Sequence, residues 1–163
     1  MVLGLSLSAF TTLHVVISLI AIVAGLIVMF GMLGPYRAGG LTGIFLLFTI
    51  LTSVTGFMFP FNGITPGILI GILSCVLLAI ACLALYAMKV SGPWRWIYAV
   101  TALASLYLNV FVLIVQGFVK IPSLHALAPG NPPNGPAFAV VQGLVLLFFV
   151  VMIIGAVRRF KPA

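Results

Sequence analysis

The chain alternates long apolar runs with short breaks that contain proline or glycine, and this alternation limits what it can fold into. A helix that crosses the hydrocarbon core of a bilayer needs about 20 mostly apolar residues. The sequence predicts one domain, residues 1–163, that is an all-α integral membrane bundle of five transmembrane helices with an outer loop at 120–136. We expect the helices at about 10–33, 41–59, 66–88, 94–119 and 137–157.

The basic residues indicate the orientation of this bundle. With five spans, six of the seven basic residues fall on one side of the membrane, and Lys120 falls on the other. The six are Arg37, Lys89, Arg95, Arg158, Arg159 and Lys161. Lys and Arg accumulate on the cytoplasmic side, so we expect the N-terminus outside and the C-terminus inside. The run at 41–59 carries four threonines and a serine, and without it the chain would have four spans. Omitting it would move Arg37 to the other side and weaken the charge asymmetry, so the basic residues favour five spans.

The chain has no aspartate and no glutamate, which removes several classes of function. Without carboxylates it cannot form a Ser-His-Asp triad, a paired-carboxylate hydrolase site or a carboxylate calcium site. No nucleophile, base and orienting group can be assembled, so we expect no hydrolase activity. The scattered basic residues form no patch for phosphates, so we expect the bilayer, and not a nucleic acid, as partner.

The run at 94–119 carries a polar stripe along nearly its whole length. The members lie within about 100° of arc at helical spacing. They are Tyr98, Thr101, Ser105, Asn109, Gln116 and Lys120. Unsatisfied amides in hydrocarbon cost several kcal/mol, so we expect the stripe to face the bundle, a partner subunit or water.

Polar residues of the other helices converge on the outer half of the bundle. His14 lies about 6 Å below the outer boundary, and Gln116 lies at a similar depth on the fourth helix. The pattern predicts an outward-facing polar pocket that binds or passes a small neutral or anionic molecule. The candidate ligand-binding residues are His14, Ser18, Ser53, Asn109, Gln116, Lys120 and Gln142.

Other interpretations of the same residues remain open. The hydroxyls and amides are also typical of contacts between membrane helices, and Lys120 is typical of a side chain that reaches the interface. The polar stripe could dock on a second copy or on a larger membrane complex, which would make the chain an accessory subunit. His14 or His125 could hold haem, quinone or a metal ion, although no spacing motif supports such a site. The outer loop is rich in proline, which suits a rigid spacer.

Several segments together resemble an uncharacterised family of small bacterial multi-pass membrane proteins. They are residues 106–113 with Gln116, Lys120 and Pro122, then 127–129 and 136–138, and also 52–57, 59–61 and 94–96. The resemblance implies a place in the bacterial cytoplasmic (inner) membrane. It implies no activity, cofactor or catalytic residue.

Overall fold

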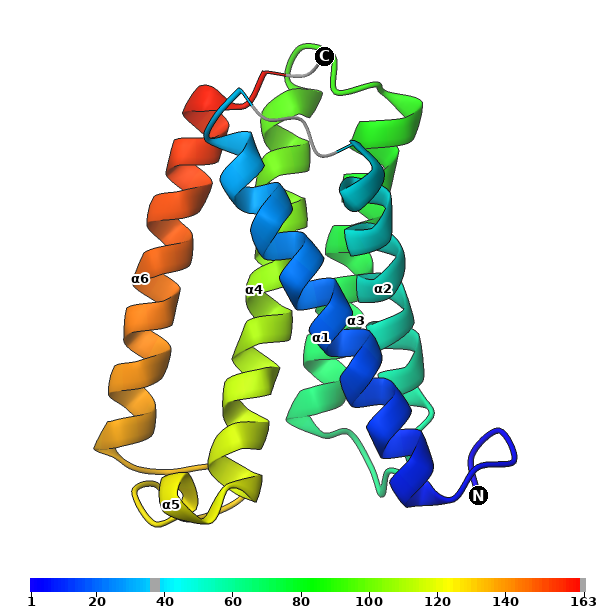
Figure 1. Ribbon diagram of the computed structural model, residues 1–163, viewed down its shortest axis with the longest axis vertical. Helices are drawn as coiled ribbons and strands as arrows, with labels where there is room; N and C mark the ends of the chain where they lie inside the picture. Colours follow the sequence, from blue (N-terminus) through cyan, green and yellow to red (C-terminus); the bar gives the residue numbers. More distant parts are fainter. Residues whose placement is uncertain (36–38, 162–163) are drawn as a thin grey trace.

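The computed structural model describes residues 1–35 and 39–161, and within them it contains helices and loops but no β-sheet. The helices are α1 (Leu7–Met32), α2 (Gly39–Phe57), α3 (Pro66–Cys82), α4 (Trp94–Lys120), α5 (Pro122–His125) and α6 (Pro136–Arg159), and a π-helical turn, η1 (Leu83–Ala87), extends α3. Five helices are long and apolar enough to cross a membrane, which confirms the predicted bundle (Figure 1).

Local side chains explain where the helices begin and end. Helix α1 begins three residues before the prediction because the Ser6 hydroxyl accepts the backbone N–H of Ala9 at 3.1 Å. Helix α3 begins as predicted, with Thr65 as its N-cap and Pro66 in its first turn. Helix α2 ends at Phe57, two residues before the prediction. The one-turn helix α5 within the predicted outer loop was not anticipated.

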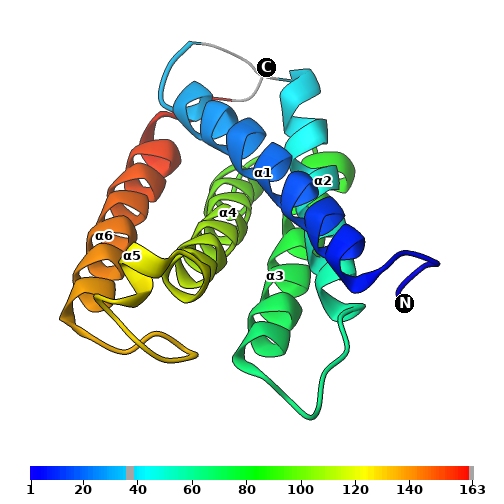
Figure 2. The same cartoon turned by 60° about the horizontal axis from the view of Figure 1, so that its bottom comes forward.

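Four of the membrane-spanning helices surround a common axis, and the fifth lies outside them. Helix α1 packs along α2, α2 on α3, α3 on α4, and α4 returns to α1. Helix α6 packs mainly on the far side of α4, and α5 covers the end of α4 (Figures 1 and 2). Helix α4 is therefore a shared wall between the four-helix ring and α6.

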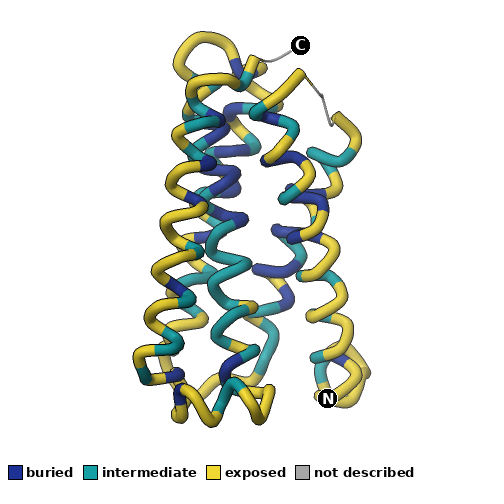
Figure 3. The backbone as a smooth tube through the Cα atoms, turned by 60° about the vertical axis from the view of Figure 1, so that its left-hand side comes forward, coloured by how far each residue is buried: buried dark blue, intermediate teal, exposed yellow. Residues whose placement is uncertain are grey.

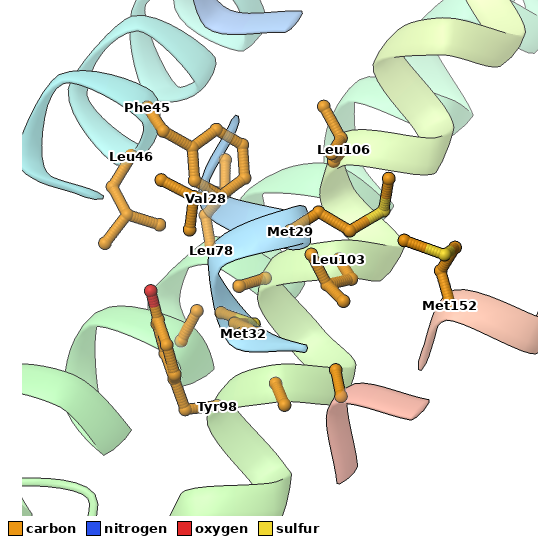
Figure 4. Close-up of a cluster of buried hydrophobic side chains, with 14 of the residues drawn as sticks. Val28, Met29, Met32, Phe45, Leu46, Leu78, Tyr98, Leu103, Leu106 and Met152 are labelled. Atoms are coloured by element: carbon orange, nitrogen blue, oxygen red, sulfur yellow. The ribbon is translucent and has the colours of Figure 1, made fainter. Parts of the chain in front are cut away.

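The apolar core fills only one half of the ring. Its largest fully buried residues include Met29, Phe45, Leu46, Leu78 and Leu103, which lie toward the end where α1 finishes and α4 begins (Figure 4). Figure 3 shows the buried positions concentrated in that half and intermediate positions in the other. The half that contains the N-terminus and α5 is consequently less tightly packed.

The described basic residues lie at the two ends of the bundle as the sequence predicts. Lys89, Arg95, Arg158, Arg159 and Lys161 are at the end where α4 begins and α6 finishes, and Lys120 is at the opposite end. Arg37, which the prediction also used, lies outside the described residues. At the basic end, the Arg95 guanidinium donates to the Phe160 carbonyl and so joins the start of α4 to the end of α6.

A close crossing at Gly25 joins α1 to its neighbours. A Cβ atom added at Gly25 would lie 2.6 Å from Leu106 Cδ1 and 2.8 Å from Phe45 Cδ2, and both of these side chains are fully buried. The absence of a side chain at this position therefore lets α1 approach α2 and α4 closely.

We expect Gly25→Ala to lower the free energy of unfolding by about 1–3 kcal/mol, the usual cost of overpacking a core. Thermal unfolding in detergent measures the change. Gly143→Ala on α6 is the matched control, because a Cβ there meets nothing within 4 Å. It should be neutral or stabilising by up to about 1 kcal/mol. Equal losses in the two variants would contradict the close crossing.

Candidate functional site

A cavity of about 670 Å³ occupies the half of the ring that the apolar core leaves open. It lies between the first turns of α1, the end of α2, the start of α3 and the end of α4. On α4 its wall extends from Leu108 to Lys120, about 18 Å along the helix axis. Its polar lining residues are Thr11, His14, Ser18, Thr52, Ser53, Ser74, Asn109, Gln116 and Lys120.

The floor of the cavity is closed by the core. Thr52 and Ser53 are the lining residues of α2 nearest the core, and Thr49 and Phe45, about one and two turns further along, are 1% and 0% exposed. On α4 the lining begins at Leu108, and Leu106 just beyond it is 0% exposed. Within the described residues the cavity is therefore blind at this end.

A hydroxyl pair joins α2 to α3 at this floor. Ser53 Oγ donates its proton to the Thr49 carbonyl oxygen at 3.1 Å, and it lies 3.3 Å from Ser74 Oγ, whose hydroxyl can donate to it. Both serines are buried. The pair holds the two helices together where the cavity ends.

The position of His14 is fixed by a hydrogen bond and by aromatic contacts. Its Nδ1 lies 2.7 Å from Thr55 Oγ1, and its ring meets the Phe59 ring edge-on with 5.2 Å between centroids. Phe59 in turn contacts Phe10 at 5.0 Å. Because α2 ends at Phe57, the chain can turn and bring Phe59 back against α1. The imidazole is therefore held against the cavity wall.

The hydrogen bonds of Thr55 determine which proton His14 carries. Thr55 Oγ1 lies 2.7 Å from the Leu51 carbonyl oxygen, which can only accept, so the hydroxyl proton is used there. The contact between His14 and Thr55 then requires His14 Nδ1–H to donate. In the neutral ring Nε2 is consequently the unprotonated nitrogen, and it is the one that His14 can offer to a ligand.

Most other hydroxyls in the wall are used within their own helices. Thr11 donates to the Leu7 carbonyl at 2.8 Å, and Ser18 donates to the His14 carbonyl at 2.8 Å. Thr52 likewise bonds to the residue four positions earlier. Such bonds satisfy hydroxyls in an apolar environment and leave lone pairs as acceptors. The predicted contacts between helices are therefore made by only some of these residues.

The polar stripe of α4 divides into two parts with different surroundings. Thr101 and Ser105 are buried beside the core and bond to carbonyls of their own helix. Asn109, Gln116 and Lys120 line the cavity, and none of their side chains bonds to a described residue. Asn109 Nδ2 is also closed off from solvent. These three side chains therefore make no hydrogen bond between the described helices.

The cavity brings together six of the seven predicted site residues. Gln142 is the exception, because α6 packs on the opposite side of α4. Its Nε2 donates to the Phe111 carbonyl at 3.1 Å, and its side chain is 8% exposed. Gln142 is thus a contact between α4 and α6, which is the alternative role that the sequence left open.

The structure does not bring His125 to His14. His125 belongs to α5, and its Nδ1 lies 3.1 Å from the Phe118 carbonyl oxygen. His125 is absent from the cavity lining. In the part of the chain that the structure describes, no group of three or more His and Cys side chains could hold a metal ion.

Sequence reasoning missed the apolar wall of the cavity. This wall lies where α2 ends and α3 begins, and it consists of Phe57, Phe59, Phe61, Ile68 and Ile70. Apolar residues near a membrane surface have the same composition whether they face lipid or a cavity, so the sequence held no signal for them. Thr55 was missed because its partner comes from another helix.

Comparisons of the chain with family models, curated proteins and solved structures found no significant match. The function is therefore inferred from the geometry of the cavity.

We expect a cysteine at position 116 to react readily with a water-soluble maleimide, because Gln116 is exposed in an open cavity. The background is Cys75→Ala with Cys82→Ala, which removes both free thiols. Gln142→Cys is the matched control, and it should react far more slowly because that side chain is packed between α4 and α6. Mass spectrometry of the detergent-solubilised variants measures both rates. Equal rates would contradict the cavity.

Proposed function

We propose that this protein binds a small neutral or anionic molecule in the cavity between α1, α2, α3 and α4. The observation that carries the proposal is the set of unused polar groups on α4. Asn109, Gln116 and Lys120 line the cavity and make no hydrogen bond to the described residues. Buried polar groups in a membrane-spanning bundle are normally satisfied within the protein, so the unpartnered Asn109 amide nitrogen, on one cavity wall with Gln116 and Lys120, favours a ligand.

The charge and size of the cavity support the same proposal. Among the described residues that line the cavity, Lys120 is the only lysine or arginine, and the chain has no aspartate or glutamate to attract a cation. The volume of about 670 Å³ lies within the usual range of small-molecule sites, about 300–1,000 Å³. The cavity therefore suits a neutral or anionic molecule of small size.

The closed floor favours binding over passage. A molecule that crossed the protein would have to displace Phe45 and Leu106, which are fully buried beyond the polar floor. Close-packed cores resist such displacement. We therefore assign the cavity a binding role.

We also propose a bacterial cytoplasmic membrane location, with the cavity open to the exterior. The resemblance to small bacterial membrane proteins supports the location. The basic residues at the end where α4 begins support the orientation, because positive charge is retained on the cytoplasmic side. Lys120 then lies at the outer surface.

An impermeant maleimide tests this orientation on intact cells. Gln116→Cys, in the background without Cys75 and Cys82, should be labelled from outside. Ser91→Cys, which is exposed in the loop at the opposite end, should be labelled only after the membrane is opened. The reverse pattern would show the opposite orientation.

We expect Asn109→Leu to abolish ligand retention while keeping or raising stability. Leucine is similar in size and removes a buried amide nitrogen that lacks a partner, so the free energy of unfolding should rise by up to about 2 kcal/mol. Native mass spectrometry of protein solubilised from its own membranes measures the retained molecule, and thermal unfolding measures stability.

Thr49→Val is the control for this variant. Thr49 is buried outside the cavity and bonds to the Phe45 carbonyl, so the substitution should leave any retained molecule unchanged. A wild-type protein that retains no small molecule, or an Asn109→Leu protein that retains it fully, would contradict the proposed function.

A further inference from the structure

Helices α1 and α4 touch at one end of the cavity and separate toward the other. They meet at Gly25 and Leu106. From there α1 runs away from α4 toward the end that carries α5, as both cartoon views show (Figures 1 and 2). Residues from both helices line the cavity between these separating halves, so side chains do not fill the space. Helix α6 lies against the other side of α4 and does not cover it.

Apolar side chains flank this separation well inside the membrane-spanning part. Val15 of α1 and Leu113 of α4 both line the cavity, and each is 40% exposed. Val15 lies about 12 Å from the start of α1, and Leu113 lies about 10 Å from the end of α4. These depths are within the hydrocarbon region of a bilayer, so the cavity faces lipid between the two helices.

The polar groups closest to this opening form one cluster. His14 lies eleven residues from the crossing on α1, and Gln116 lies ten residues from it on α4. At 1.5 Å per residue, His14 lies about 16 Å and Gln116 about 15 Å from the crossing, each along its own helix, so the two are at similar depths. Lys120 is one turn beyond Gln116. The cluster combines a cation, an unused amide and a ring nitrogen.

We propose that the cavity takes an anionic single-chain amphiphile from the bilayer. The anionic oxygens of its head, as in a carboxylate, bind Lys120 and Gln116 beside His14, and its hydrocarbon chain leaves between Val15 and Leu113. The aromatic wall formed by Phe57, Phe59 and Phe61 covers the part of the chain nearest the head. This inference rests on the proposed function and names the class of its ligand.

Palmitate is the probe, and butyrate is the soluble control with the same head. The full-length protein is placed in nanodiscs of uncharged lipid, and binding is followed by native mass spectrometry and by the unfolding temperature. We expect one bound palmitate and no effect of butyrate at the same concentration. Lys120→Gln should weaken palmitate binding about fivefold, as for loss of an exposed ion pair, whereas Lys161→Gln should not.

A second pair of variants tests the route through the lipid. Val15→Trp places a large ring in the opening and should reduce palmitate binding strongly. Val16→Trp is the matched control, because Val16 is 48% exposed and does not line the cavity. Unfolding temperatures without ligand show that both variants are folded.

Three outcomes would overturn the inference. Butyrate binding as tight as that of palmitate would show a ligand that enters from water, and the proposed function would still stand. Equal palmitate binding by the two tryptophan variants would exclude the opening between α1 and α4. If palmitate does not bind at all, an anionic single-chain amphiphile is excluded as the ligand. The proposed function is then judged separately, by whether wild-type protein retains a small molecule that the Asn109→Leu protein loses.

Discussion

The structure depends on one requirement of the bilayer, which is that polar groups inside it must find partners within the protein. Most of the described hydroxyls do so by bonding to a carbonyl three or four residues earlier in the same helix. The side-chain amide of asparagine or glutamine carries two N–H donors and one acceptor oxygen. A single bond to a carbonyl of the same helix therefore satisfies less of it than of a hydroxyl. Gln142 uses a carbonyl of α4 across an interface, whereas Asn109 and Gln116 are directed to a cavity.

The bundle combines a packed half with an open half by varying the residues along each helix. Toward the basic end, Gly25 allows α1 to approach α4, and large apolar side chains fill the space around the crossing. Toward the other end, the polar stripe of α4 continues with the longer side chains of Asn109, Gln116 and Lys120, and α1 diverges from α4. The same four helices thus supply both a rigid base and a cavity wall.

The sequence predicted the number of spans from the apolar runs, and it predicted six of the nine polar residues of the cavity lining from their helical spacing and depth. Runs of about 20 apolar residues indicate membrane-spanning helices. Asn109, Gln116 and Lys120 share one face of a helix, so the spacing indicates that their side chains point to the same side. It could not predict that Gln142 lies outside the cavity, because that depends on which side of α4 receives α6. It also could not predict the bond between His14 and Thr55, which joins residues 41 positions apart. Which helices lie side by side, and which side chains bond between them, depends on tertiary packing and not on the local sequence pattern.

Helix α1 is close to its neighbours at Gly25 and diverges from α4 beyond it, so a small rotation about this crossing displaces the N-terminal half of α1. His14 lies about 16 Å along the helix from this point, so each degree of rotation about the crossing moves it by roughly 0.3 Å relative to α4. Gly25 does not line the cavity, yet the crossing at this residue sets the width of the cavity mouth. Natural replacements at position 25 would be expected to widen or narrow the mouth while leaving every residue of the polar lining unchanged.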